Sequence, residues 1–193
     1  MTSVIKLSSL ATNKYWEILV LFEDDHLLAL DKPTELPCSP DAANPDRPNL
    51  MTLLHTAIEK NAVCVRDRKI EYLANANRLE PETTGVVLLA KDKPTWINLA
   101  NQFGNETPCK SFIGLACGHP RQNSFRVEHK LASNLDLSGR MRCDPEGGKK
   151  ALTQFDVLEN FSRYTLLKCQ PLTDRLHQIR VHLSRQRLPL AGD

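Results

Sequence analysis

The chain has 193 residues, 41% of them hydrophobic and 25% charged, and a formal net charge of +2 at pH 7. This length allows one domain, or a small pair, with a hydrophobic core, and the composition is ordinary for a globular protein. No apolar run approaches the ~20 residues of a membrane-spanning helix, and the N-terminus lacks a signal-peptide pattern. We therefore expect a soluble, cytoplasmic protein with no membrane partner.

The first half of the chain predicts a hairpin, an irregular loop and a helix. Apolar runs on both sides of the acidic residues 23–25 are typical of a hairpin over residues 17–33. Five prolines from Pro33 to Pro48 mark an irregular loop, a feature that often carries function. Apolar residues then recur at helical spacing, which predicts an amphipathic helix over residues 50–60.

The second half predicts mainly strands, with two further helices. We expect strands over residues 85–91, 110–118, 124–131, 151–160 and 163–172, a polar loop or hairpin tip over 138–150, and helices over 92–105 and 175–186. In the last helix Leu176, Ile179 and Leu183 share one face. This order indicates an α+β fold in which hairpins outnumber β-α-β units, without a convincing domain boundary.

Charge is distributed unevenly along the chain. Residues 1–60 carry five Lys or Arg against nine Asp or Glu, whereas residues 161–193 carry six against two. A basic C-terminal segment suits a polyanion such as nucleic acid, although charge alone favours a solvated helix surface. The six cysteines form no C-x-x-C pair and have no histidine at zinc-ligand spacing, so we expect reduced thiols and no metal site.

Residues 77–85, "NRLEPETTG", place two carboxylates just before a predicted buried strand. Glu80 and Glu82 could act as an acid and a base, as in glycoside hydrolases. A turn in which Thr83 or Thr84 satisfies backbone groups is the better interpretation of the loop taken alone.

A second polar group, Arg175, His177, Arg180 and His182, surrounds a predicted loop-to-helix junction. Arginine offers a rigid fork of donors to a carboxylate or phosphate, although a basic surface helix explains the pattern equally simply. The five-residue histidine spacing does not suit a metal-binding helix. The segment 146–153 lacks the lysine-serine or lysine-threonine ending of a phosphate loop.

Four separated stretches, in order along the chain, resemble RluA-type RNA pseudouridine synthases. Residues 18–40 resemble the opening of that family, and residues 77–91 its H-R-L-D-x-x-T-S-G loop and the strand that follows. Residues 110–120 resemble its K-x-Y-x-A-x-x-x-G strand, and residues 171–193 its G-R-T-H-Q-I-R-V-H-L…G-x-P-I-x-G-D segment. Several motifs in the same order make a more specific signal than any single motif.

The resemblance implies a pseudouridine synthase fold, with a mixed, largely antiparallel sheet flanked by helices and an RNA-binding cleft. It implies an enzyme without a cofactor that cleaves the N-glycosidic bond of a uridine in rRNA or tRNA, turns the uracil and rejoins it through carbon. It places an N-terminal extension at residues 1–17 and the catalytic domain at residues 18–193. Relatives continue beyond "PLAGD", so the resemblance also implies a domain that is truncated at its C-terminus.

Site residues follow from the same motifs. The resemblance implies that Glu80 stands at the essential aspartate, Arg180 at its arginine partner and Phe112 at the tyrosine that stacks on uracil. Arg78 matches the arginine that fills the space of the extruded base. The remaining residues implied to bind RNA are Lys110, Arg175 and His177.

Several positions depart from the family motifs: Glu80 for aspartate, Asn77 for histidine, Phe112 for tyrosine, Asp174 for glycine and Leu176 for threonine. A longer acid that shifts its carboxylate by ~1 Å costs on the order of 10²-fold in rate. Loss of a proton-transferring hydroxyl costs ~10²–10⁴-fold.

Four hypotheses therefore stay open. The first is an RNA pseudouridine synthase with impaired activity, and the second is a catalytically inactive RNA-binding relative. A hydrolase that uses Glu80 and Glu82 is supported by the loop alone. The fourth is a truncated chain that does not fold stably. The sequence indicates neither the target uridine nor the oligomeric state.

Overall fold

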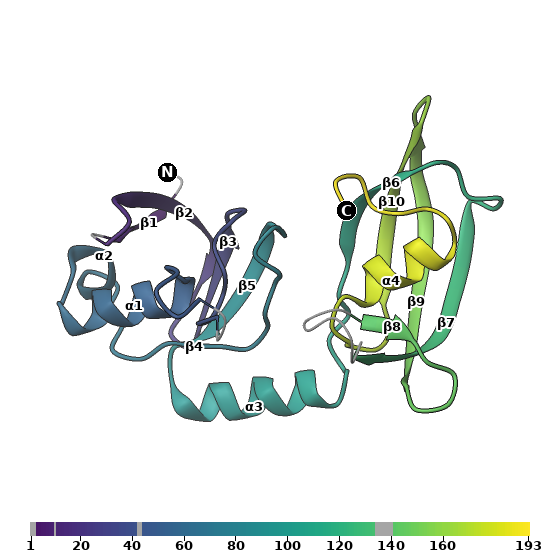
Figure 1. Cartoon of the computed structure of the whole chain (residues 1–193). Coiled ribbons are helices and arrows are strands. Elements are labelled where there is room, and N and C mark those ends of the chain that lie inside the picture. The colour runs from purple at the N-terminus through teal and green to yellow at the C-terminus, as the bar shows by residue number, and fades with distance from the viewer. Residues whose placement is uncertain (1–2, 10, 42–43, 134–140) are drawn as a thin grey trace. The chain divides into compact units, whose positions relative to one another are not determined.

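The computed structural model describes residues 3–193 apart from residue 10, residues 42–43 and residues 134–140. The chain divides into two compact units, Met1–Asn105 and Glu106–Asp193 (Figure 1). The sequence shows no convincing boundary there, because only a short polar connection separates the last helix of the first unit from the first strand of the second.

The first unit is an antiparallel sheet with three helices. Its elements are β1 (Val4–Ser9), β2 (Lys14–Glu23), β3 (Leu27–Lys32), α1 (Leu50–Glu59), α2 (Val63–Arg66), β4 (Ala74–Asn75), β5 (Gly85–Ala90) and α3 (Lys93–Gly104). The strand order is β1-β2-β3-β5-β4, and each neighbouring pair is antiparallel. The predicted 17–33 hairpin is confirmed as β2–β3.

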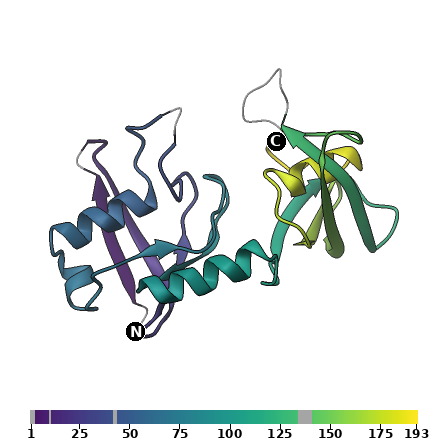
Figure 2. The same cartoon turned by 90° about the horizontal axis from the view of Figure 1, so that it is seen from below.

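Helix α1 packs on one face of this sheet and closes the first hydrophobic core (Figure 2). The Asn49 side chain caps the helix by accepting from the backbone N–H of Thr52 at 3.0 Å. Leu50 and Leu54 are fully buried, as the helical spacing predicts. They pack among Ile18 and Leu30 of the sheet.

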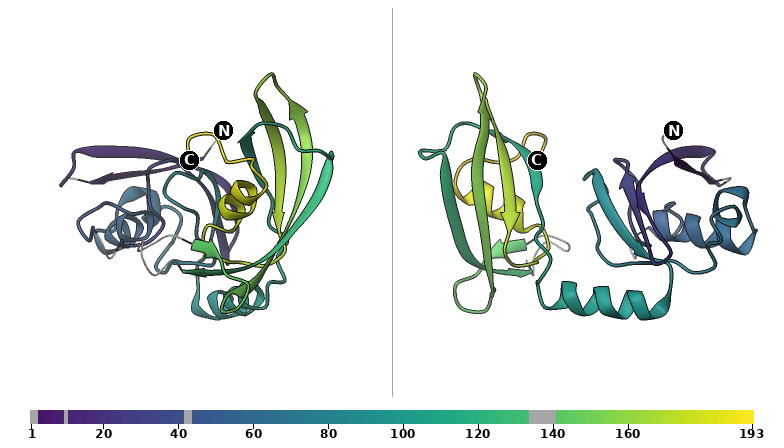
Figure 3. Two further views of the ribbon diagram at one scale, coloured as in Figure 1. Left: turned by 45° about the vertical axis from the view of Figure 1, so that its right-hand side comes forward. Right: turned by 180° about the vertical axis from the view of Figure 1, so that it is seen from behind.

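The second unit consists of β6 (Phe112–Cys117), β7 (Ser124–Ser133), β8 (Met141–Cys143), β9 (Lys149–Asn160), β10 (Tyr164–Pro171) and α4 (Gln178–Arg185). The order β6-β10-β9-β7-β8 is again antiparallel throughout. Helix α4 lies against one face of the sheet (Figure 3). Beneath it Phe155 stacks on Phe125, with ring centroids 5.1 Å apart, and both pack with Leu183 in a second core.

The predicted α+β class with largely antiparallel sheets is confirmed. The short elements β1, α2 and β4 were not predicted from the sequence. Within the segment expected as an N-terminal extension (1–17), Val4–Ser9 form β1 and Lys14 begins β2, and Ile5 and Leu7 are buried in the first core. Residues 138–140 of the expected polar loop lie outside the described residues, while 141–143 form β8.

The helix predicted over 175–186 begins later, at Gln178. His177 has φ 51°, a left-handed conformation that a right-handed helix cannot include. Leu176 therefore lies before the helix and is 55% exposed, so its predicted place on the buried face is wrong.

Two further observations concern the chain as a whole. None of the described helices is long and apolar enough to cross a membrane. All six cysteines are free thiols, of which Cys38 and Cys169 are buried.

We expect Phe155→Ala to destabilise the second unit by about 3–5 kcal/mol, because it leaves a cavity in a close-packed core. Urea unfolding followed by circular dichroism measures the loss. Phe161 lies in the β9–β10 turn and is 44% exposed, so the control Phe161→Ala should stay within about 0.5 kcal/mol of the wild type. Equal losses for the two variants would contradict the proposed core.

Candidate active site

The loop at residues 77–85 connects β4 to β5, and Asn77 fixes its first residue against β5. The Asn77 side chain donates to the carbonyl of Val86 at 3.0 Å and accepts from the N–H of Leu88 at 2.8 Å. Ala76 adds a backbone hydrogen bond from its N–H to the Leu88 carbonyl at 2.8 Å. The asparagine that departs from the family motif therefore extends the strand pairing in this protein.

Glu80 begins a tight turn in this loop. The N–H of Thr83 donates to the carbonyl of Glu80 at 3.0 Å, and Pro81 takes the second position, where its fixed φ suits a β-turn. Leu79 packs against the first core just before the turn, and its N–H donates to the Cys38 sulfur at 3.3 Å. Glu80 is half-buried, and its backbone is held on both sides.

Lys32 anchors this turn from below the surface. Its side chain is fully buried, and Nζ donates to the carbonyls of Pro33 at 2.7 Å, Leu36 at 2.8 Å and Pro81 at 3.0 Å. These three hydrogen bonds use every donor of a lysine ammonium. Burial lowers the pKa of Lys32. The ammonium therefore ties the proline-rich loop after β3 to the turn that begins at Glu80.

From the sequence, Lys32 was counted only as one of the five positive charges in residues 1–60, and this structural role was not predicted. The spacing of Lys32 could have indicated its burial. Leu28, Leu30 and Lys32 are each two residues apart in β3, so they share one face of the strand, and all three are buried. A lysine at an inward position of a strand needs several acceptors. The neighbouring Thr34 hydroxyl adds a second link by donating to the Glu82 carbonyl at 3.1 Å.

Lys110 and Arg175, both predicted to bind RNA, pair with acids in the second unit. Lys110 Nζ lies 2.6 Å from Asp174 Oδ2, and Arg175 Nη1 lies 2.8 Å from Glu106 Oε1. The N–H of Asp174 also donates to Glu106 Oε1 at 3.0 Å, which joins the two pairs. Asp174, which departs from the family glycine, therefore reduces the positive charge around Lys110.

Arg180 and His177 line one shallow hollow of about 470 Å³ beside α4, together with Arg142, Arg185 and Asp193. Arg180 forms an ion pair with Asp193. The structure thus brings together two of the predicted residues and adds Arg142 and Arg185, which the motifs did not indicate. This cationic hollow is suited to phosphate groups.

His182 does not belong to this polar surface, contrary to the grouping expected from the sequence. It is fully buried, and Nδ1 lies 2.9 Å from the Thr153 hydroxyl on β9. Burial lowers the pKa of His182 to about 4, and the nearby His129 adds to this effect. The buried Gln178 side chain donates to the same hydroxyl at 2.9 Å, so the network fixes α4 to the sheet.

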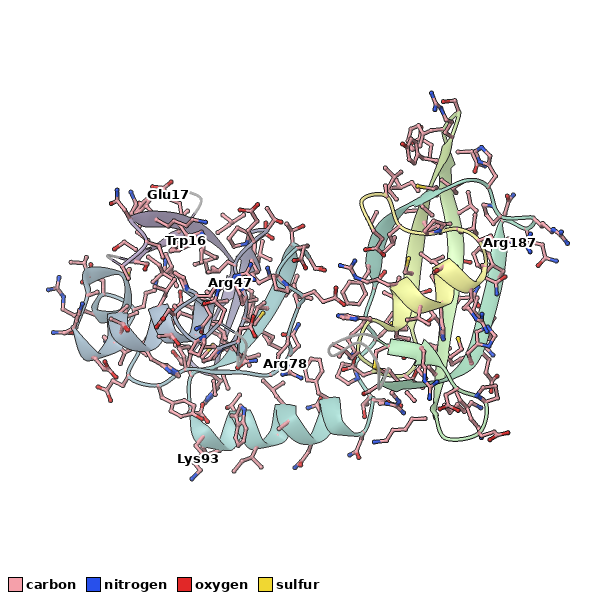
Figure 4. The ribbon with its side chains drawn as sticks, in the orientation of Figure 1. Trp16, Glu17, Arg47, Arg78, Lys93 and Arg187 are labelled. Carbon is pink, nitrogen blue, oxygen red and sulfur yellow. The ribbon has the colours of Figure 1, made fainter. Side chains whose placement is uncertain are left out.

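The other predicted residues differ in exposure. Phe112 opens β6 and is partly buried against the second core. Arg78, labelled in Figure 4, is an exposed residue of the 77–85 loop. Glu80 and Arg180 belong to different units, so the pair implied by the resemblance stays a prediction.

Comparison with known proteins matches the chain to one family. The family model described as RNA pseudouridylate synthase matches residues 26–185. A ribosomal large subunit pseudouridine synthase D of Nitrosomonas europaea is 34% identical over 174 residues, which cover 90% of this chain and 48% of that protein. The mitochondrial tRNA pseudouridine(32) synthase of Saccharomyces cerevisiae is 31% identical over 180 residues, which cover 91% of this chain and 36% of that protein.

Solved structures show the same fold. Human RNA pseudouridylate synthase domain containing 4 superimposes with a TM-score of 0.71 at 25% identity, covering 90% of this chain and 67% of that one. Human RNA pseudouridylate synthase domain containing 1 has the same TM-score at 20% identity, covering 91% and 68%. The chain spans about half the length of the bacterial curated relatives that it matches.

We expect Lys32→Met to destabilise the protein, since it keeps the volume of the side chain but leaves the buried carbonyl of Leu36 and the part-buried carbonyls of Pro33 and Pro81 without their donor. The penalty for a buried unsatisfied group is about 1–3 kcal/mol. Urea unfolding measures the loss, and hydrogen exchange should show faster exchange at Thr83, whose N–H closes the turn. Lys14→Met on the exposed start of β2 is the control. An equal loss of stability in this variant would contradict the proposed role of Lys32.

We expect stability to fall as pH falls from about 6.5 to about 4, because the unfolded chain binds a proton at His182 that the folded chain does not. The contribution is about 3 kcal/mol at most. Urea unfolding across this pH range should show a shallower decline for His182→Asn than for the wild type. Asp92 raises the pKa of His26, so this histidine acts in the opposite direction. A decline flattened by His26→Gln instead would contradict the assignment.

Proposed function

This chain belongs to the RNA pseudouridylate synthase family, and we propose that it isomerises uridine to pseudouridine in ribosomal or transfer RNA. The observation that carries the proposal is the fixed turn at Glu80. Its backbone is held by Leu79 on one side and by the Lys32 anchor at Pro81 on the other. A reacting carboxylate requires such a fixed position, because small displacements cost large factors in rate.

The chemistry assigns a role to each site residue. A uracil stacked in RNA is out of reach, so the nucleotide has to be flipped out at a cost of a few kcal/mol. Arg78, exposed on the same loop as Glu80, fills the vacated space and offsets part of this cost. The Phe112 ring offers a stacking surface to the extruded base.

In this proposal Glu80 acts as the nucleophile or as the base at the ribose, and Arg180, at the position of the partner arginine in the family motif, is the group expected to keep it ionised. A nearby guanidinium favours the charged form of a carboxylate, as either role requires at neutral pH. Glutamate carries the same charge as the family aspartate on a side chain one methylene longer. We expect a functional but slow enzyme, since only the reach of the carboxylate differs.

The substrate is proposed from the electrostatics of the second unit and from the names of the relatives. His177, Arg180 and Arg142 line a hollow that suits RNA phosphates, and Lys110 and Arg175 reach RNA by exchanging Asp174 and Glu106 for phosphate. The matched relatives are named for ribosomal or transfer RNA. A cytoplasmic location stays a prediction from the sequence.

A second candidate function is RNA binding without catalysis. It is favoured by three substitutions at the site: Glu80 for aspartate, Phe112 for tyrosine, and Asp174, whose carboxylate pairs with Lys110. This alternative expects salt-dependent RNA binding that survives the loss of the Glu80 carboxylate.

We expect Glu80→Gln to lower pseudouridine formation by at least about 10²-fold, because the amide can act neither as nucleophile nor as base. Ribosomal and transfer RNA transcripts, mapped by pseudouridine-specific primer extension, give the measurement. Glu82→Gln, an exposed position two residues away, is the matched control and should keep wild-type activity. RNA binding by both variants should match the wild type.

Glu80→Asp separates the two candidate functions. Faster modification by Glu80→Asp than by an active wild type would support a catalytic acid of suboptimal length. Modification by Glu80→Asp with none by the wild type would favour the inactive relative instead.

A further inference from the structure

A second groove in the Glu106–Asp193 unit is lined by none of the predicted site residues. It has a volume of about 640 Å³ and is lined by residues 118–122 after β6, by Phe125 and Arg126 of β7, and by residues 185–188 at the end of α4. Four arginines line it, namely Arg121, Arg126, Arg185 and Arg187, and no acidic residue does. We call it the arginine groove.

The four arginines differ from the cations of the candidate site in their partners. All four are exposed, and none forms an ion pair with a carboxylate among the residues that the structure describes. Lys110, Arg175 and Arg180, in contrast, each pair with an acid. Like charges gathered around one concavity repel one another and attract anions. Guanidinium groups also match phosphate with two parallel donors.

The dipole of α4 explains only part of this cluster. Cations are favourable near the C-terminus of a helix, where Arg185 and Arg187 lie. Arg121 and Arg126 come from the β6–β7 connection and from β7, so the dipole does not account for them. Arg187, labelled in Figure 4, has φ 59° in the position after the helix cap, which glycine occupies more easily. The backbone conformation at this position therefore does not explain why the residue is an arginine.

The groove is preformed. The ring of Phe125 stacks on the buried Phe155, and Leu188 is almost fully buried on the other side. The N–H of Leu188 donates to the Leu183 carbonyl at 3.0 Å, which closes the end of α4. His119 lies 3.1 Å from the Thr165 hydroxyl through its Nδ1 atom. A rigid base keeps the arginines close together without a ligand, which lowers the entropic cost of binding.

The position of the groove suggests an extended anion and not a single phosphate. Phe112 begins β6 and Gly118 follows its end, so the groove lies about 20 Å along the strand from Phe112 at ~3.3 Å per residue. Arg185 lines both the groove and the hollow that holds His177 and Arg180. Cationic side chains thus follow α4 from the hollow to the groove, and the ~20 Å between Phe112 and the groove covers several nucleotides of a backbone.

We propose that the arginine groove binds backbone phosphates of the RNA several nucleotides from the uridine at the candidate site. This inference rests on the proposed function, because it takes RNA as the substrate. The groove would contribute affinity and orientation without reading the sequence, as phosphate contacts generally do. It is separate from the residues that carry the chemistry, so binding and turnover can be tested independently.

The test compares Arg121→Gln/Arg126→Gln with Lys14→Gln/Lys149→Gln in the full chain. Both double variants lose two exposed cations, but only the first changes the groove. Binding of a fluorescent RNA stem-loop is measured over a series of salt concentrations. The slope of log affinity against log salt should fall by about 1.4–1.8 for the arginine variant, since each lost phosphate contact removes ~0.7–0.9. The lysine variant should keep the wild-type slope.

Modification kinetics keep this inference distinct from the proposed function. The arginine variant should need more RNA for half-maximal rate but reach the wild-type rate at saturation. If the wild type is active but the arginine variant shows an unchanged salt slope and an unchanged RNA requirement, the proposed role of the groove is wrong and the proposed function still stands. If the arginine variant shows a reduced salt slope but the wild type is inactive, RNA binding by the groove is supported and the proposed catalysis is contradicted.

Discussion

The buried ammonium of Lys32 holds together the two loops on which the candidate chemistry depends. A charged group without water needs its full set of hydrogen bonds, and only the carbonyls of Pro33, Leu36 and Pro81 together supply them. That requirement fixes the backbone next to Glu80 more firmly than the turn could alone. The backbone that carries Glu80, the proposed reacting residue, is therefore held from inside the first unit by the buried Lys32.

The second unit shows the opposite electrostatic arrangement, in which most functional charges are at the surface. Three cations of the candidate site, Lys110, Arg175 and Arg180, each pair with an acid. Cations of the arginine groove have no such balance among the described residues. RNA would displace existing ion pairs at the first place and meet uncompensated charge at the second. The groove should thus dominate the long-range attraction of RNA, and the candidate site its short-range placement.

The elements with strong periodicity were predictable from the sequence. The repeat of Leu50, Leu54 and Ala57 located α1, and the continuous apolar run at residues 86–89 located β5. The start of α4 was not predictable, because no Gly or Pro in the local sequence marks the left-handed backbone at His177. The hydrogen bonds of Gln178 and His182 to Thr153 join residues that are distant in sequence, and local patterns carry no trace of them.

The burial of Lys32 has a consequence for its chemical reactivity. A lysine-selective acylating reagent needs an uncharged amine in contact with solvent, and Lys32 offers neither contact nor a free lone pair while its three hydrogen bonds are intact. Opening of the loops that it joins would remove this burial and bring the amine into contact with solvent and reagent. The extent of acylation at this one position therefore reports how often the turn at Glu80 comes apart.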